Sequence, residues 1–412
     1  MRVILLLPIL LEENLLLNKF FIILFWVLAF LFTGCNDDPT SLGENLIPEQ
    51  DQINVFYINS TDSSFKIKTR VFDSDTLDLG TAKTLFLGKH DNVESTMLMK
   101  FYMFFPDSVR KKILADSLVL ITASMEMKPT YTYGDKNAFF DFSVHEILND
   151  WNSLEFTKEN LQDLSYKPED ASSNHIFEDD SLITMYINRD LVNTWMKLAA
   201  EQNQETNYGV YFNFVAGTDK VLGFTAISMY NDSLLTTLKL VLKDLTKGVT
   251  DTTNITVTSD VHVVVGKLPD NPSNNIILQG GIPIRSNLYF DLSKVPTVSI
   301  INRANLKLFI NKDETKTGTK STDYLRIFLI NNFETSEINT DYGNIGLKLD
   351  STKSYYSGEI SPFVQEWLSN NNTGIKLAHY DDSESLNKIS IYGAEAPDSL
   401  KPLLEIIYTS KN

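Results

Sequence analysis

Short runs in which apolar residues alternate with polar ones, or follow one another without a break, recur along most of the chain. Successive side chains of an extended strand point to opposite faces, so such runs predict β structure. Polar turn clusters such as 132–135, 269–272 and 370–374 separate them. The chain is therefore predicted to be mainly β. The expected strands are 65–71, 84–87, 97–105, 118–124, 139–144, 209–214 and 238–242 in the first half, and 261–265, 286–290, 305–310, 324–330, 374–377, 389–392 and 403–408 in the second.

Two stretches, 191–200 and 363–368, instead carry apolar residues three and four positions apart, which is the spacing of one helix face. Asn188 can cap the first helix, and Ser361 with Pro362 can open the second. Two antiparallel sheets with one short covering helix make a β-sandwich, here of the jelly-roll kind.

The two halves also match each other in a fixed order, which indicates an internal repeat. The matched segments are 86–89 with 264–267, 115–120 with 304–308, 147–151 with 329–333, 191–195 with 363–367, 208–210 with 373–375, and 227–230 with 389–392. We therefore expect two tandem β-sandwich domains, residues 50–247 and 248–412, joined by a polar stretch near 243–254.

The N-terminal residues indicate secretion and lipidation. Lys19 precedes an uncharged segment, 20–33, that suits a signal peptide and is short for a membrane span. The segment leads to Leu31-Phe32-Thr33-Gly34-Cys35, which resembles the lipobox where a bacterial prolipoprotein is cleaved and acylated. We expect a cleaved signal peptide over 1–34 and a lipidated linker over 35–49.

One alternative is a transmembrane anchor over most of residues 3–34, although Glu12 and Glu13 would be costly in hydrocarbon. A true start codon near residues 15–17 would explain why the first residues fit a signal peptide less well.

Acylation of Cys35 by chains such as palmitate would hold the protein at a membrane, because each buried methylene contributes about 0.8 kcal/mol. The acidic sequence Asn36-Asp37-Asp38 resembles the surface-export signals of Bacteroidota lipoproteins, and its alternative is the start of a solvated linker. The expected location is the outer membrane, facing the cell surface, with the periplasmic face as the alternative.

Composition and charge narrow the classes of partner. Hydrophobic residues make up 43% of the chain and charged ones 22%, enough apolar material for packed cores. The formal net charge of −17 makes nucleic acid an unfavourable partner. Because Cys35 is the single cysteine, stability must come from core burial rather than an internal disulfide.

The start of the mature chain carries a family resemblance. The sequence of 35–48, with Leu85-Phe86-Leu87-Gly88 and Asp116-Ser117-Leu118-Val119-Leu120, resembles an uncharacterised Bacteroidota lipoprotein family that contains domain of unknown function 4270. The resemblance spans most of the mature chain. It implies a lipidated outer-membrane protein without an assigned activity.

Each repeat is also loosely similar to jelly-roll domains of the DNRLRE type, which are related to carbohydrate-binding modules. The segments that carry this likeness are 118–122, 144–147 leading into Trp151, 156–157, 191–195 and 207–210. The second repeat departs from the pattern, with Phe333 in the place of Trp151.

Catalytic signatures do not occur in the sequence. It has no Gly-x-Ser-x-Gly elbow, no His-Glu-x-x-His, no glycine-rich phosphate loop and no cysteine pair. The five histidines are isolated from one another, and the acidic pairs Asp179-Asp180 and Asp381-Asp382 lack the ligand spacing of a calcium loop. We therefore expect no enzyme activity, no cofactor and no metal.

Aromatic residues in turns are the candidates for ligand stacking. Tyr131 and Tyr133 stand in an expected loop, and Tyr355 and Tyr356 precede the second helix. Aromatic faces can stack on sugar rings while the hydroxyl groups stay in water, and packing is the alternative for each pair. The tryptophans Trp151, Trp195 and Trp367 recur in the repeats and are expected in the core.

A further pattern is Asp followed by Ser or Thr, which resembles the O-glycosylation acceptor of Bacteroidota; a turn that enters a strand gives the same letters. The candidates are Thr76, Ser117, Ser181, Ser233 and Ser399.

These observations predict a non-catalytic, lipid-anchored surface lipoprotein that binds a glycan or an envelope protein through its β-sandwich modules. One alternative is a structural or assembly lipoprotein of an outer-membrane complex. The other is an enzyme acting on polysaccharide, which would need two carboxylates facing each other in one cleft.

Overall fold

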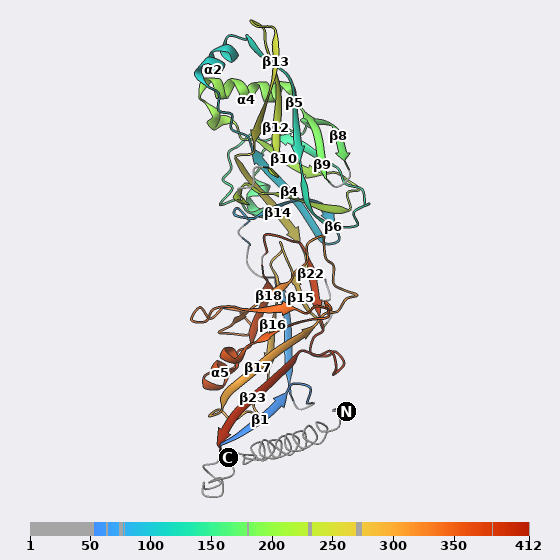
Figure 1. Cartoon of the computed structure of the whole chain (residues 1–412), viewed down its shortest axis with the longest axis vertical. Coiled ribbons are helices and arrows are strands. Elements are labelled where there is room, and N and C mark those ends of the chain that lie inside the picture. Colours follow the sequence, from blue (N-terminus) through green and yellow to red (C-terminus); the bar gives the residue numbers. More distant parts are fainter. Residues whose placement is uncertain are drawn as a thin grey trace, which may run out of the picture. The chain divides into compact units, whose positions relative to one another are not determined.

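The computed structural model (Figure 1) describes residues 53–62, 65–73, 77, 79–178, 181–229, 233–268, 274–380 and 382–411. The predictions for the signal peptide, the linker, Cys35 and Thr76 lie outside these residues. None of the helices in the described ranges is long and apolar enough to cross a membrane.

The chain is mainly β, with 46% strand and 12% helix, as the sequence predicts. Its described strands form three antiparallel sheets, one of which is curled into a half-barrel. By its contacts the chain divides into a unit of Tyr57–Tyr408, which holds almost all of the described residues, and a small unit to which Ile53–Phe56 and Thr409–Lys411 belong.

Two sheets make up what we call the first β lobe, residues 84–266. The seven-stranded sheet has the order β6-β11-β3-β4-β10-β7, with β14 on the other side of β4, and the five-stranded sheet has the order β13-β12-β5-β9-β8. The strands are β3 (Thr84–His90), β4 (Val93–Lys100), β5 (Leu118–Met127), β6 (Pro129–Gly134), β7 (Phe142–Glu146), β8 (Ser172–Glu178), β9 (Leu182–Ile187), β10 (Val210–Phe214), β11 (Lys220–Thr225), β12 (Thr237–Asp244), β13 (Val249–Thr256) and β14 (Ser259–Gly266).

One apolar cluster joins these two sheets. It includes Met97 and Phe212 from the seven-stranded sheet, Met125 and Leu240 from the five-stranded sheet, and Trp195 from the helix α4. The inward side chains of both sheets thus bury each other, which is the main source of stability in the lobe.

The second β lobe is an eleven-stranded sheet with the order β1-β23-β17-β20-β19-β18-β21-β16-β15-β22, and β2 also pairs with β16. Its strands are β1 (Ile53–Asn59), β2 (Ile67–Asp73), β15 (Ile276–Gln279), β16 (Ile284–Phe290), β17 (Ile300–Phe309), β18 (Tyr324–Leu329), β19 (Ile345–Leu349), β20 (Tyr355–Glu359), β21 (Ile375–His379), β22 (Lys388–Ile391) and β23 (Leu403–Lys411). Leu288, Ile327 and Ile406 of this sheet bury one face against Trp367 of the helix α5.

Both predicted helices are confirmed. Helix α4 (Arg189–Glu201) begins after Asn188, whose side chain accepts hydrogen bonds from the backbone N–H groups of Asp190 and Leu191. Helix α5 (Ser361–Ser369) has its proline in the first turn, where no hydrogen bond is lost.

The expectation of one helix per repeat is incomplete, because the first lobe also contains α2 (Asp107–Leu114) and α3 (Lys158–Gln162). Of the residues in α2 only Ile113 is buried, so its sequence carries almost no apolar stripe. The short 3₁₀ turns Gln204–Thr206 and Ile227–Met229 complete the helical elements of the described residues.

Strand pairing crosses the predicted boundary at residues 247 and 248 in both directions. Strands β13 and β14 follow that boundary but pair with β12 and β4 of the first lobe. Strands β1 and β2 precede the first lobe in sequence but join the sheet of the second, and Figure 1 shows the blue β1 beside the red β23. The matched segments 86–89 and 264–267 consequently lie in one sheet and are not counterparts in separate sheets.

Candidate functional site

Tyr131 and Tyr133 are not in an exposed loop, and that prediction is wrong. Both lie in β6 with 1% of their surface exposed. Their strand is covered by Gly318, where a Cβ atom would come within 2.5 Å of the Tyr131 ring. Only glycine permits this close approach, and the turn-like letters around 132–135 do not reveal it.

The second tyrosine pair is split between the two faces of β20. Tyr356 is 1% exposed, and its hydroxyl donates to the carbonyl oxygen of Thr322 at 2.6 Å. Tyr355 points to the outer face, where it is half-buried and the ammonium of Lys307 lies 4.7 Å from its ring centroid. Of the four predicted stacking residues, Tyr355 alone has an accessible ring.

The hydroxyl of Tyr131 has a structural role instead. It donates to Oδ1 of Asn387 at 3.0 Å and accepts from the backbone N–H of Leu386 at 3.0 Å. Burial raises the pKa of Tyr131, so the hydroxyl keeps its proton. The first lobe thus fixes the chain segment that leads into β22.

Asn387 extends this contact to the loop before β18. Its Oδ1 also accepts from the N–H of Gly318 at 2.7 Å, and its Nδ2 donates to the carbonyl oxygen of Lys320 at 2.8 Å and to Oγ1 of Thr322 at 2.9 Å. The buried amide therefore has partners on both ends, which stabilises the geometry of the loop.

The loop and the segment before β22 enclose a pocket of about 180 Å³, which we call the loop pocket. Its polar lining comes from hydroxyl, carboxylate and amino groups, and its remaining lining from two tyrosines and a histidine. The lining residues are Lys320, Ser321, Thr322, Asp323, Tyr324, His379, Tyr380, Glu384 and Ser385.

Beside the loop pocket stands a group that we call the tyrosine shelf, made of Tyr324, Arg326 and Tyr380. The tyrosines are 41% and 47% exposed, and their ring centroids lie 5.7 Å apart with 48° between the planes. The guanidinium carbon of Arg326 lies 4.4 Å from the Tyr380 centroid, which is cation–π distance. The shelf therefore exposes two aromatic rings to solvent, and the guanidinium of Arg326 packs against the ring of Tyr380.

His379 lines the loop pocket. The side chain is 2% exposed, and Nε2 has no hydrogen-bond partner among the described residues. Burial, and then the nearby Arg285 charge, lower its pKa to about 3, so the ring is neutral at physiological pH. A neutral ring nitrogen can accept or donate one hydrogen bond to a bound group.

The two carboxylates of the loop pocket already have partners. Glu384 forms an ion pair with Lys83 at 2.9 Å, and Asp323 accepts from Oγ of Ser321 at 2.7 Å. Carboxylates oriented in this way suit recognition of hydroxyl groups. Among the described residues no group of three or more His, Cys, Asp or Glu side chains could hold a metal ion.

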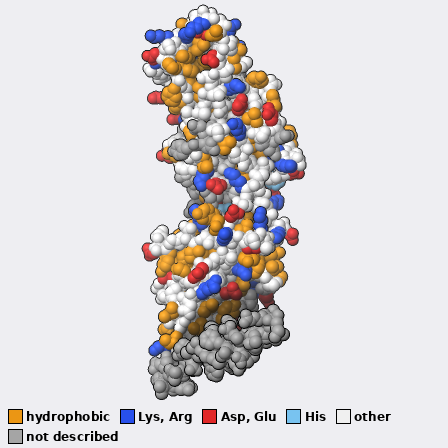
Figure 2. Space-filling view, in the orientation of Figure 1, with side chains coloured by type: hydrophobic (Ala, Val, Ile, Leu, Met, Phe, Trp, Pro, Cys, Tyr) orange, Lys and Arg blue, Asp and Glu red, His pale blue; other side chains and the backbone are white. Residues whose placement is uncertain are grey.

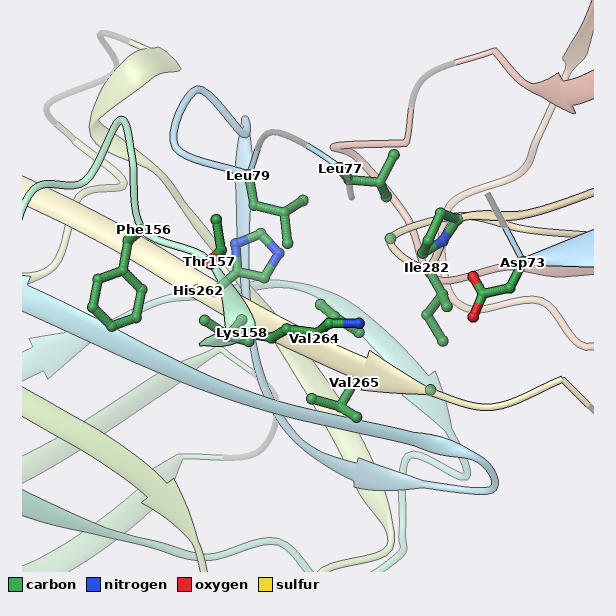
Figure 3. A pocket seen from close by; sticks show the side chains of 14 residues that line it. Asp73, Leu77, Leu79, Phe156, Thr157, Lys158, His262, Val264, Val265 and Ile282 are labelled. Carbon is green, nitrogen blue, oxygen red and sulfur yellow. The ribbon is translucent and has the colours of Figure 1, made fainter. Parts of the chain in front are cut away.

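A second pocket, of about 110 Å³, lies beside β14 (Figure 3). His262 lines it, is fully buried and has no hydrogen-bond partner at either ring nitrogen within the described part of the chain. Its ring packs edge-on against Phe86 at 5.2 Å, and burial lowers its pKa to about 3. Figure 3 shows the ring near Leu79 and Thr157, with Asp73 and Ile282 at the other end.

The remaining predicted residues divide by exposure. Trp151, Trp195 and Trp367 are buried, as expected for core residues. Ser181, Ser233 and Ser399 are exposed, while Ser117 is half-buried and donates to the carbonyl oxygen of Lys112 at 3.1 Å. The first three serines are thus accessible to a modifying enzyme. Their O-glycosylation stays a prediction.

Tyr324 and Tyr380 are not among the residues predicted from the sequence. Both are tyrosines at strand ends next to acidic residues, in Asp323-Tyr324 and Tyr380-Asp381-Asp382. This sequence pattern could have identified them as candidate binding residues, because an aromatic ring at a strand end is often exposed beside a polar loop.

Comparison with known proteins gives no relative: no family model, no curated protein and no solved structure matches the chain. The assignment of function therefore depends on the geometry of this chain.

The Tyr131 contact can be tested with a matched pair of variants. Tyr131→Phe leaves the Leu386 N–H without its acceptor, so we expect a loss of about 1–3 kcal/mol in unfolding free energy by urea denaturation. Tyr133→Phe should cost less than about 1 kcal/mol, because the buried Tyr133 hydroxyl has no hydrogen-bond partner among the described residues. Equal losses in the two variants would contradict the role given to Tyr131.

The buried His262 predicts a pH dependence of stability. Its folded pKa of about 3 lies below the usual histidine value of 6.5, so stability is lost as the pH falls below about 6.5. His262→Met should reduce the loss of unfolding free energy between pH 7 and pH 5 by about 2 kcal/mol. Urea titrations at both pH values measure this, and an equal loss in both proteins would show that the ring protonates within the fold.

Proposed function

We propose that this protein is a non-catalytic, lipid-anchored surface lipoprotein of the cell envelope that binds a glycan. The tyrosine shelf beside the loop pocket is the observation that carries the proposal. In this proposal each β lobe is a jelly-roll-like sandwich, and the chain belongs to the Bacteroidota lipoprotein family that it resembles.

The shelf supports glycan binding because a pyranose ring has an apolar face that stacks on aromatic side chains. Tyr324 and Tyr380 supply two such surfaces at an angle of 48°, enough to follow a bent chain of sugars. Hydroxyl groups of a stacked sugar would then meet Asp323, Glu384 and Lys320 in the pocket. Apolar surface with a few directed polar groups is the usual composition of a ligand site.

Binding is favoured over hydrolysis at this site. A glycosidase needs one carboxyl group that acts as a proton donor and a second that is free to act as base or nucleophile. Glu384 is paired with Lys83, and Asp323 with Ser321. Both carboxylates are thus oriented by neighbours, as a binding site requires.

Anchoring through Cys35 would place the loop pocket on a membrane-bound protein. The proposed location is the outer membrane, with the sequence Asn36-Asp37-Asp38 directing the module to the cell surface. Attachment through several acyl chains leaves the β lobes in water, where they can reach a polymer.

Removal of the shelf tests the proposed function. Tyr324→Ala and Tyr380→Ala should each weaken binding to the recognised glycan roughly tenfold, because each removes one stacking face. The measurement is a glycan array followed by titration, with the full-length protein in mild detergent.

Tyr186→Ala is the matched control, because Tyr186 is 45% exposed on β9 of the first lobe. The control should keep the affinity of the unaltered protein. A failure to bind any polysaccharide, or an equal loss in the control, would refute the proposal.

The anchor gives a separate prediction. Cys35→Ala removes the thiol that would be acylated, so the protein should leave the membrane fraction after cell lysis and carbonate washing. Loss of the acyl mass in spectrometry of the intact protein should accompany release. Retention of the variant in the membrane would instead indicate a transmembrane anchor formed by most of residues 3–34.

A further inference from the structure

The lining of the loop pocket ranges from exposed to buried side chains. Tyr324 and Tyr380 of the tyrosine shelf line it and are 41% and 47% exposed, whereas His379, which also lines it, is 2% exposed. His379 pairs with the buried Leu325 in the strand register, so its side chain lies on the core side of β21. The pocket therefore brings a buried imidazole close to an exposed aromatic surface.

One nitrogen of the His379 ring faces the end of β15. Nδ1 lies beside Gly280, where an added Cβ atom would come within 3.5 Å of it. Burial lowers the pKa of His379, whereas hydrogen bonds with the backbone of Asn387 and Leu278 raise it. A backbone group raises a histidine pKa by accepting from the ring N–H, so these partners are carbonyl oxygens.

The other ring nitrogen is left with a lone pair. Nε2 of His379 has no hydrogen-bond partner among the described residues. A neutral imidazole has one N–H, and the backbone carbonyl groups hold it at Nδ1. Nε2 can then accept a hydrogen bond from a bound group but cannot donate one.

A bare ring nitrogen selects for hydrogen-bond donors. A sugar hydroxyl can donate to the lone pair, whereas the oxygen of a carboxylate or sulfate group only accepts. Two acceptors that meet in a buried place both stay without a hydrogen, which is unfavourable. The imidazole therefore favours hydroxyl groups over acidic groups in the pocket.

The carboxylates of the loop pocket favour the same donors. Oδ1 of Asp323 accepts from Ser321, and Oε1 of Glu384 pairs with Lys83. Each carboxylate has a second oxygen that can accept from a hydroxyl of the ligand. An acidic group of a ligand would instead meet two like charges at short range.

The formal charges of the pocket lining and of the shelf cancel. Asp323 and Glu384 are anionic, Lys320 and Arg326 are cationic, and the His379 ring is neutral. Figure 2 shows cationic and anionic side chains interspersed on the face of the second lobe that it presents. The net charge of −17 acts at long range against every polyanion, acidic polysaccharides included. A ligand without charge matches these features best.

We propose that the ligand of the tyrosine shelf and the loop pocket is a neutral polysaccharide, and that His379 selects it by accepting a hydrogen bond from a sugar hydroxyl at Nε2. This inference rests on the proposed glycan-binding function and specifies its ligand class. A sugar ring stacked on the shelf would direct a hydroxyl group into the pocket. His379 is then a specificity-determining residue of the site.

The first test compares neutral polysaccharides with charged forms of the same polymers. Dextran, galactan, mannan and xylan are arrayed, each beside its sulfated derivative, and the full-length protein in mild detergent is titrated by calorimetry with each polymer that binds. The neutral form should bind at least tenfold more tightly than the sulfated form. Added salt should leave this binding unchanged, because salt screens interactions between charges.

Variants of His379 test its role in selection. His379→Phe keeps an aromatic ring but removes the acceptor, so it should weaken binding of the neutral polymer about tenfold. His379→Gln retains a side-chain carbonyl oxygen and should keep part of the affinity. His262→Met is the matched control, because His262 is also buried without a partner among the described residues but lies in the first lobe. The control should bind as the unaltered protein does.

Deoxy sugars identify the hydroxyl that donates to His379. Oligosaccharides of the bound polymer, each lacking one hydroxyl, are titrated against the unaltered protein and His379→Phe. The oligosaccharide without the donor should bind the unaltered protein about tenfold more weakly than its parent, yet bind His379→Phe as tightly as the parent does. A merely structural role for His379 would not produce this coupling. Urea midpoints identify a variant that fails to fold, and the comparison of neutral with sulfated polymers needs no variant.

The remaining outcomes separate the two proposals. Equal or tighter binding of the sulfated forms overturns the neutral ligand and leaves glycan binding intact. Full affinity of His379→Phe overturns the role of His379. Failure to bind any polysaccharide on the array overturns both proposals.

Discussion

The alternation of side chains along β-strands is the constraint on which the second lobe depends. Inward residues such as Ile327 and Leu377 must fill the core, and a shift of register by one residue would exchange the two faces of a strand. Because the core fixes the register, the outward residues are fixed as well. Arg326 and Lys376 can therefore lie beside aromatic rings at defined positions without contributing to the core.

Buried polar groups complete the site, and they differ in how well they are satisfied. Asn387 has partners at both ends of its amide and connects Tyr131 of the first lobe with the loop that precedes Tyr324. His262 and His379 instead keep ring nitrogens without partners among the described residues, a cost of about 1–3 kcal/mol for each such group. Water or a ligand that enters the adjoining pocket can offset this cost by forming a hydrogen bond with the ring nitrogen.

Local patterns in the sequence predicted part of the local structure. The predicted apolar runs became strands, and the Asn188 cap and the Pro362 turn located α4 and α5. Other strands were missed, among them β6, part of which was expected to be a turn. Pairing between distant segments could not be predicted from the sequence. Arg70 pairs with Asn287, for example, and no local sequence pattern indicates this pairing. The burial of Tyr131 likewise depends on Gly318, far along the chain. The tyrosine shelf was missed for the same reason, since Tyr324 and Tyr380 meet only when β18 and β21 pair.

Hydroxyl-radical footprinting can test directly whether a glycan binds at the tyrosine shelf. Tyr324, Tyr380 and Tyr186 are exposed to a similar extent, 41%, 47% and 45%, so all three should be oxidised in the free protein. With bound polysaccharide, oxidation of Tyr324 and Tyr380 should fall while that of Tyr186 stays unchanged. Protection of Tyr186 alone, or unchanged oxidation of all three at saturating ligand, would show that the glycan does not bind at the shelf.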